Sequence, residues 1–160
     1  MHNALGGAAA GFVATVPMTV VMEALRAALP AEQHRRMPPR EIVDRTIDKA
    51  IENTGEGAEL DRRDRAALTT LAHLAFGAAA GAVYGATVNS RRSSVLTGVM
   101  YGLGVWAVAY GVGLPSLGLH PAAAHDTRDR NEVLVASHVM WGAVLGKLTQ
   151  SKFFGSPVSK

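Results

Sequence analysis

Residues 66–90, AALTTLAHLAFGAAAGAVYGATVNS, form a long apolar run without a single Asp, Glu, Lys or Arg. Residues 1–22 and 93–125 are also free of these four residue types. A bilayer core about 30 Å thick needs roughly 20 apolar residues at about 1.5 Å each, so each of the three runs is long enough to cross it. A soluble helix of this length would carry a charged stripe at helical spacing. None of these runs does, so all three are predicted to span a membrane.

A fourth apolar run, residues 133–146, is shorter and lies between Glu132 and Lys147. It reaches the required length if Lys147 extends its charged tip to the membrane interface and the helix continues to residue 149. The sequence therefore predicts an all-α integral membrane protein with one domain over residues 1–160. Its spans are expected at about 4–28, 66–87, 95–114 and 133–149.

The composition excludes several classes of protein. The chain has no cysteine, which rules out a disulfide framework and a thiolate metal site. The formal net charge of +3 is small and scattered, so no nucleic-acid partner is expected. The first apolar run lacks the basic start of a signal peptide and is longer than its apolar region. The expected partner is the lipid bilayer, alone or together with other membrane subunits or further copies of this chain.

The polar connection over residues 30–65 contains an amphipathic pattern. Ile42, Val43, Ile47 and Ile51 fall on one face of a helix expected at about 39–52. Pro39 suits its first turn, where a backbone N–H would be unpaired in any case. This pattern predicts an interfacial helix after the first span, lying against the mouth of the bundle or the lipid headgroups.

A short motif occurs twice. Residues 73–81 and 138–146 both read His-x-x-aromatic-Gly-Ala-x-x-Gly. Because consecutive spans alternate in direction, the two copies lie on helices that run in the same direction. Such a parallel repeat is expected of duplicated halves, so the sequence predicts a four-helix bundle made of two similar helical hairpins.

Small residues recur at four-residue spacing in every span. In lipid, helices associate largely through close packing of such faces, so these glycines are predicted to be packing residues. They are Gly7, Gly11, Gly77, Gly81, Gly85, Gly98, Gly102, Gly142 and Gly146. His73 and His138 each precede a glycine of this set by four residues, and both are therefore predicted to face the interior of the bundle.

Three ionisable residues form the candidate site: Glu23, His73 and His138. Each lies roughly 9–12 Å along its helix from the same membrane face, at about 1.5 Å per residue. Ionisable groups inside a span are costly and usually mark function. We therefore expect the three side chains to meet in an intramembrane polar cluster.

The chemistry of such a cluster has several interpretations. It can be a structural polar core held by hydrogen bonds, or a proton relay. One carboxylate and two imidazoles can also hold a divalent metal or iron, and two histidines can be the axial ligands of a haem. A further alternative is an accessory subunit of a larger membrane complex. The sequence has no nucleophile elbow, phosphate loop or metalloprotease helix, so a non-enzymatic role is favoured.

A second group of metal-binding residue types lies between the third and fourth spans. His120, His125 and Asp126 could bind a metal, but their spacing matches no specific signature. A solvated loop is the favoured interpretation, and these residues are secondary candidates.

An ordered set of motifs resembles the YagU-like family of small uncharacterised bacterial inner-membrane proteins. The set comprises Pro17 and Glu23, Met-Pro-Pro-Arg-Glu at 37–41, His73-x-x-Phe76-Gly77, Gly81-x-x-Tyr84-Gly85, Tyr101-Gly102-x-Gly104 and His138-x-x-Trp141-Gly142. The resemblance implies a multi-pass protein of the bacterial cytoplasmic (inner) membrane. It also implies a loose link to acid tolerance, which would suit a proton role for the Glu and His residues.

Overall fold

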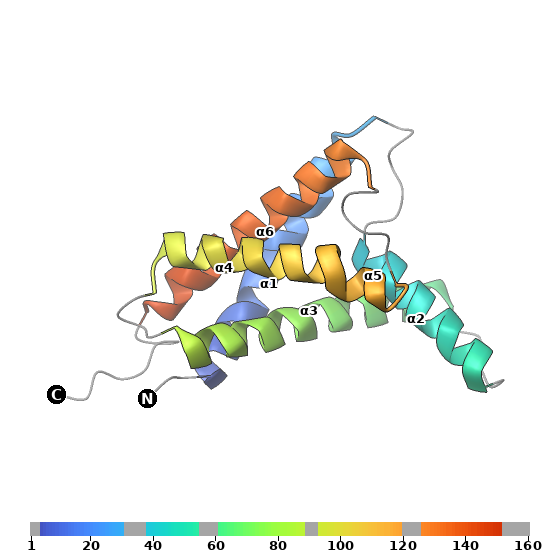
Figure 1. Cartoon of the computed structure of the whole chain (residues 1–160), viewed down its shortest axis with the longest axis horizontal. Helices are drawn as coiled ribbons and strands as arrows, with labels where there is room; N and C mark the ends of the chain where they lie inside the picture. Colours follow the sequence, from blue (N-terminus) through green and yellow to red (C-terminus); the bar gives the residue numbers. More distant parts are fainter. Residues whose placement is uncertain (1–3, 31–37, 55–60, 89–92, 120–125, 152–160) are drawn as a thin grey trace.

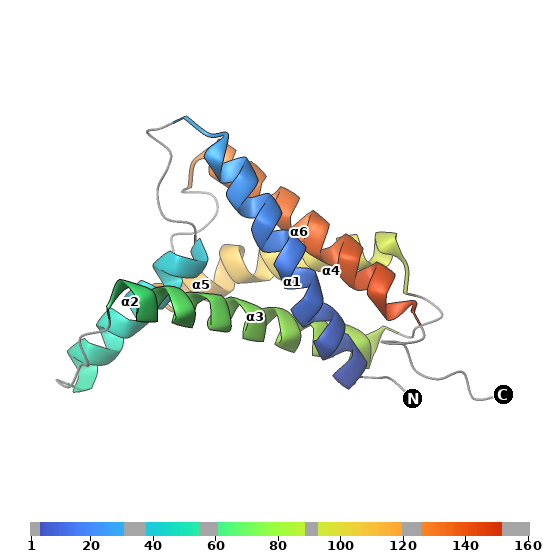
Figure 2. The same ribbon diagram turned by 180° about the vertical axis from the view of Figure 1, so that it is seen from behind.

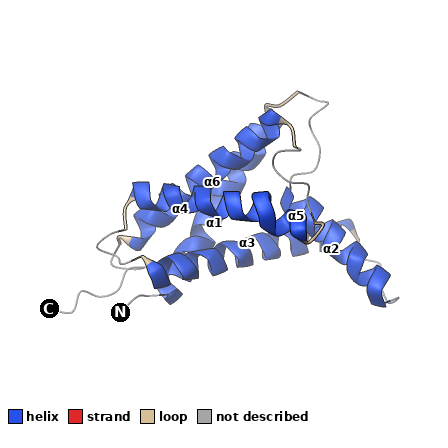
Figure 3. Ribbon diagram, viewed as in Figure 1, coloured by secondary structure: helices blue, strands red, loops and turns tan. Residues whose placement is uncertain are grey.

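The structure is a computed structural model that describes residues 4–30, 38–54, 61–88, 93–119 and 126–151, and these segments are helical with short connections (Figures 1 and 3). The elements are α1 (Ala4–Ala27), α2 (Pro38–Thr54), α3 (Arg62–Thr87), α4 (Val95–Val108), η2 (Ala109–Gly113), α5 (Leu114–Ser116) and α6 (Arg128–Thr149). No strand occurs in the described segments. The predicted all-α class is therefore confirmed.

Three helical segments are long and apolar enough to cross a membrane. They are α1, α3 and the continuous run Val95–Ser116. The segment expected as the fourth span, in α6, is not among them. Helix α6 begins at Arg128, earlier than predicted, and its first turn is charged. Much of α6 is enclosed by the other helices, including Leu134, His138, Trp141 and Leu145.

A π-helical turn interrupts the third long helix. In η2 the N–H of Leu114 donates to the carbonyl of Ala109, five residues earlier. Pro115 follows directly, and proline has no N–H to donate and its ring clashes with the carbonyl four residues before it. The widened turn lets the chain continue helically into α5, and it places the ring of Tyr110 in the protein interior.

Helices α1 and α3 pack against each other through glycine. A Cβ added at Gly7 would lie 2.8 Å from the Cα of Gly85, and one added at Gly11 would lie 2.8 Å from the Cα of Gly81. The partner residue number falls as the α1 number rises, so the two helices are antiparallel. Backbones approach this closely only where neither residue has a side chain.

Helices α4 and α6 form a second antiparallel pair of the same kind. A Cβ at Gly98 would lie 2.8 Å from the Cα of Gly146, and one at Gly102 would lie 3.2 Å from the Cα of Gly142. Together the two pairs use all of the glycines singled out from the sequence.

Residues of α3 and α6 can be matched either by the sequence repeat or by their place in the helix contacts. The two matches differ by one helical turn. The sequence repeat aligns Gly77 with Gly142. The helix contacts give a different match: Gly81 lies against Gly11 in the first pair, and Gly142 lies against Gly102 in the second. In packing, Gly81 is therefore the counterpart of Gly142. His138 then corresponds to Gly77, and its carbonyl lies against Gly102. His73 is one turn farther from its glycine contact. The two histidines are therefore equivalent in sequence but not in packing.

The two pairs join through α1 and α6, which lie side by side in the middle of the molecule (Figures 1 and 2). The indole Nε1 of Trp141 donates to the carbonyl of Gly11 at 3.2 Å. Helices α3 and α4 meet where the hydroxyl of Tyr101 donates to the carbonyl of Ala80 at 2.8 Å. Going around the assembly, the helices thus follow one another in the order α3, α1, α6, α4, and α4 again contacts α3 at Tyr101.

The amphipathic helix α2 lies against the mouth of this assembly. Arg65 of α3 pairs with Asp44 at 3.1 Å, and Lys49 donates to the carbonyl of Leu117 at 2.8 Å. The part of α2 up to Lys49 therefore contacts the ends of α3 and α5, while its C-terminal end projects away from the other helices (Figure 1).

Candidate functional site

His138 is buried, with 5% of its surface exposed. Its Nδ1 lies 2.7 Å from the carbonyl oxygen of Leu134, one turn earlier in α6. A carbonyl can only accept, so Nδ1 must carry the hydrogen and donate it. The lone pair of the neutral imidazole is then on Nε2. The ring of Tyr110 meets the imidazole edge-on, with ring centroids 5.9 Å apart.

His73 is held in the same tautomer by a different acceptor. Its Nδ1 lies 3.4 Å from the hydroxyl oxygen of Thr19. That hydroxyl donates its only hydrogen to the carbonyl of Thr15 at 2.8 Å, so in its contact with His73 it can only accept. In the neutral ring, His73 therefore also carries its hydrogen on Nδ1 and its lone pair on Nε2.

The two histidines line one cavity of about 260 Å³, which we name the inner cavity. It is lined mostly by apolar side chains from α1, α2, α3, α4 and α6, among them Met18, Met22, Phe76 and Trp141. Pro39, Ile42 and Val43 of α2 cover one side of it. The structure thus places His73 and His138 on the same cavity.

Glu23 does not line the inner cavity. It belongs to a second hollow of about 530 Å³, the outer groove, which is lined by Thr19, Glu23, Arg26, Arg40, His73 and their neighbours. The carboxylate of Glu23 is 48% exposed and accepts a hydrogen bond from Arg26 Nε at 2.8 Å. The expected three-residue cluster is therefore divided between two hollows.

The position of Glu23 follows from helix geometry. The stripe Gly11, Thr15, Thr19, Glu23 advances by four residues at each step, and each step rotates by about 40° on a helix of 3.6 residues per turn. After three steps Glu23 is turned roughly 120° from the glycine contact. It therefore faces the outer groove, while Thr15 and Met18 still face the inner cavity.

A metal site built from the predicted residues does not fit the described structure. No three His, Asp or Glu side chains gather as metal ligands within the described ranges. Asp126, a secondary candidate, accepts from Arg130 instead, at 3.0 Å. His120 and His125 lie outside the described residues.

A haem also does not fit. The inner cavity of about 260 Å³ is smaller than the sites of about 300–1,000 Å³ that hold drug-sized ligands, and a porphyrin is a large macrocycle. Two axial histidines with a macrocycle between them would require the helices to separate.

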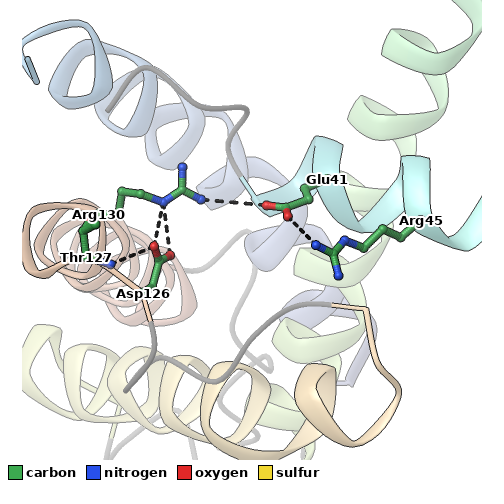
Figure 4. Close-up of polar contacts among 5 residues, drawn as sticks. All are labelled: Glu41, Arg45, Asp126, Thr127 and Arg130. Atoms are coloured by element: carbon green, nitrogen blue, oxygen red, sulfur yellow. Dashed lines mark hydrogen bonds and ion pairs between the residues drawn. The ribbon is translucent and has the colours of Figure 1, made fainter. Parts of the chain in front are cut away.

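A buried ion pair near the start of α6 was not expected from the sequence. Arg130, 5% exposed, donates from Nε to both carboxylate oxygens of Asp126 at 3.0 and 3.1 Å (Figure 4). Its Nη2 lies 3.9 Å from Glu41 of α2, which also pairs with Arg45. The i, i+4 spacing of Asp126 and Arg130 is a local signal for this pair. The approach of Glu41 depends on the tertiary fold.

A third hollow opens between α3 and α4. This side groove, of about 710 Å³, is lined by Ala80, Met100, Tyr101, Val108, Leu117 and their neighbours. It shares Phe76, Val105, Ala109 and Leu114 with the inner cavity, so the two are adjacent. Met100, Val108 and Leu117 are all more than 60% exposed.

Searches of protein-family models, curated proteins and solved structures found no match to this chain. The functional interpretation therefore depends on the geometry of these residues.

Proposed function

We propose that this chain is a multi-pass protein of the bacterial cytoplasmic membrane in which His73 and His138 relay protons between the outer groove and the inner cavity. In this proposal α6 is the fourth span, and α1/α3 and α4/α6 are two similar hairpins of one bundle. Large apolar side chains on the outside of α1, α3 and α4 support contact with lipid; they include Leu5, Val20, Leu71, Leu96, Val108 and Val112. Because protein covers most of α6, its surface need not be uniformly apolar.

The relay depends above all on one observation, which is that His73 lines both hollows. The outer groove is lined by His73 together with the half-exposed Glu23 and with Arg26 and Arg40. In the inner cavity His73 faces the space that His138 and Tyr110 also line. A side chain shared by two hollows can take a proton from one and release it to the other.

The tautomers identify the ring nitrogen that exchanges protons in each histidine. Both Nδ1 atoms donate to fixed acceptors, so Nε2 is the atom that gains and loses a proton in each ring. Glu23 would act as the surface acceptor that exchanges protons with water, and Arg26 would hold its carboxylate in place. The apolar lining keeps bulk water away from the inner step.

The relay predicts that His73→Phe slows proton exchange between water and the ring of His138. Phenylalanine fills a similar space but carries no titratable group. A positioned proton carrier contributes at least about 100-fold to transfer, so the ring proton of His138 should exchange with water at least about 100-fold more slowly in the variant. The measurement is the exchange rate of the ring N–H of His138 with water, followed by NMR on histidine labelled with nitrogen-15 in lipid nanodiscs.

Two threonines of the outer groove provide a matched control. Thr19→Val removes the acceptor that orients His73 and should slow this exchange. Thr70→Val alters the same groove, but its hydroxyl donates to the carbonyl of Ala66 within its own helix, so the rate should not change. A His73→Phe protein in which the ring proton of His138 exchanges as fast as in the native chain would exclude the relay.

A further inference from the structure

The inner cavity adjoins two hollows of opposite character. It shares Met22, Pro39 and His73 with the outer groove, which holds Glu23, Arg26 and Arg40. It shares Phe76, Val105, Ala109 and Leu114 with the apolar side groove between α3 and α4. The shared walls make the side groove the candidate route for a molecule dissolved in the lipid, and the outer groove the candidate route for protons.

The two histidines offer hydrogen-bond acceptors to a ligand in the cavity. The neutral rings of His73 and His138 use Nδ1 as a donor elsewhere, so each has only the lone pair of Nε2 for a ligand. A carbonyl or an ether oxygen cannot donate to that lone pair. A hydroxyl can, and it can also exchange its proton with the imidazole.

The remaining lining fits a flat ring. Phe76, Tyr110 and Trp141 supply aromatic surfaces, and Met18 and Met22 supply flexible apolar ones, which pack well against rings. A volume of about 260 Å³ is large enough for one substituted ring, since a cavity of about 150 Å³ already holds benzene. The larger and more open side groove, of about 710 Å³, can hold an alkyl tail.

We propose that the inner cavity binds the ring of a lipid-soluble phenol or hydroquinone, with its hydroxyl donating to a histidine Nε2 and its tail in the side groove. This inference names a ligand for the proposed relay. It rests on the proposed function in one respect, because the bound hydroxyl is the group whose proton the relay exchanges. Binding requires only the two acceptors and the apolar walls.

The test compares two probes that differ only in their donor. The first is 4-hexylphenol, and the second is its methyl ether, 4-hexylanisole, which has the same ring and tail but no hydroxyl hydrogen. Affinities are measured by calorimetric titration of the protein in lipid nanodiscs, with empty nanodiscs as the baseline. One hydrogen bond of about 1.4 kcal/mol corresponds to a tenfold difference. The phenol should therefore bind roughly tenfold more tightly to the native protein, and the double variant His73→Phe/His138→Phe should bind both probes equally.

A second pair of variants keeps both histidines and so does not depend on the stability of the double variant. Ala109→Phe places a ring where the inner cavity meets the side groove and should weaken both probes at least tenfold. Val112→Phe adds the same ring on the same long helix at an exposed position, 68% accessible, and should leave both affinities unchanged. Equal binding of phenol and anisole to the native protein would overturn the inference, as would an unchanged affinity in Ala109→Phe.

The two proposals fail in different ways. If His73→Phe leaves the proton exchange of His138 unchanged but the phenol is still preferred, the cavity is a ligand site without a relay. If protons move through His73 but the two probes bind equally, the relay remains and the phenol site is excluded.

Discussion

Alanine in place of Gly98 is expected to destabilise the protein by about 3 kcal/mol, the upper part of the range for an overpacked site. The added Cβ would lie 2.8 Å from the Cα and the N of Gly146, and it would also overlap the carbonyl of Gly142. All of these atoms belong to the backbone, so no side chain can turn aside. Relief requires α4 and α6 to separate, and that loses the close packing that holds helices together in lipid.

Gly104 is the matched control on the same helix. A Cβ added there would meet nothing within 4 Å in the described structure. Gly104→Ala should therefore be neutral or stabilising by up to about 1 kcal/mol, because alanine restricts the unfolded chain and favours the helix. Both variants are measured by unfolding in mixed micelles of increasing dodecyl sulfate content, followed by helical circular dichroism. Equal effects of the two substitutions would show that α4 and α6 are not paired through Gly98.

The packing faces of the helices could be predicted from sequence because they depend on local periodicity. Glycines at four-residue spacing lie on one side of a helix wherever that helix is placed, and Gly7, Gly81 and Gly142 all lie in helix contacts. The register between helices is a different quantity. It depends on where two helices cross, and the sequence repeat suggests a register that differs by one turn from the one in the structure.

The candidate site was predictable in part for the same reason. His73 and His138 lie near glycines on their own helices, and this local relation brings both to the inner cavity. The depth of Glu23 along its helix was predictable, but depth says nothing about the direction of the side chain. The rotation of each four-residue step from Gly11 accumulates, and at Glu23 the side chain has left the interior. Short-range spacing is therefore more reliable than long stripes for assigning interior residues.

The ion pair of Arg130 shows what sequence alone could not resolve. Charged residues at the start of a helix suggest a solvated end, and Arg128 fits that expectation with a side chain 90% exposed. Arg130 is two residues later and faces the opposite way, toward Asp126 and α2. Its burial depends on the position of α2, which is set by contacts distant in sequence.

Arg130→Ala is expected to cost about 3–5 kcal/mol, the usual result of removing one partner of a buried ion pair. The side chain of Asp126 is only 11% exposed. Without Arg130 it loses the donor to both of its carboxylate oxygens, and little water can replace it. A cation in the first turn of a helix is also unfavourable beside the helix dipole, so the arginine and the carboxylate depend on each other. The same substitution removes the guanidinium near Glu41 and should loosen α2 over the inner cavity.

Arg128→Ala separates this burial effect from a general loss of charge. Arg128 is in the same helix and pairs with Glu132 at 2.9 Å over the same four-residue spacing, but its side chain is 90% exposed and that of its partner 64%. An exposed pair contributes at most about 1 kcal/mol, so Arg128→Ala should change stability far less than Arg130→Ala in the same micelle titration. The double variant Arg130→Leu/Asp126→Leu should recover most of the loss, since an apolar pair of similar volume leaves no buried charge unpaired. If Arg128→Ala cost as much as Arg130→Ala, or the double variant were the least stable, Arg130 would not be buried against Asp126 and α2 would have no anchor at α6.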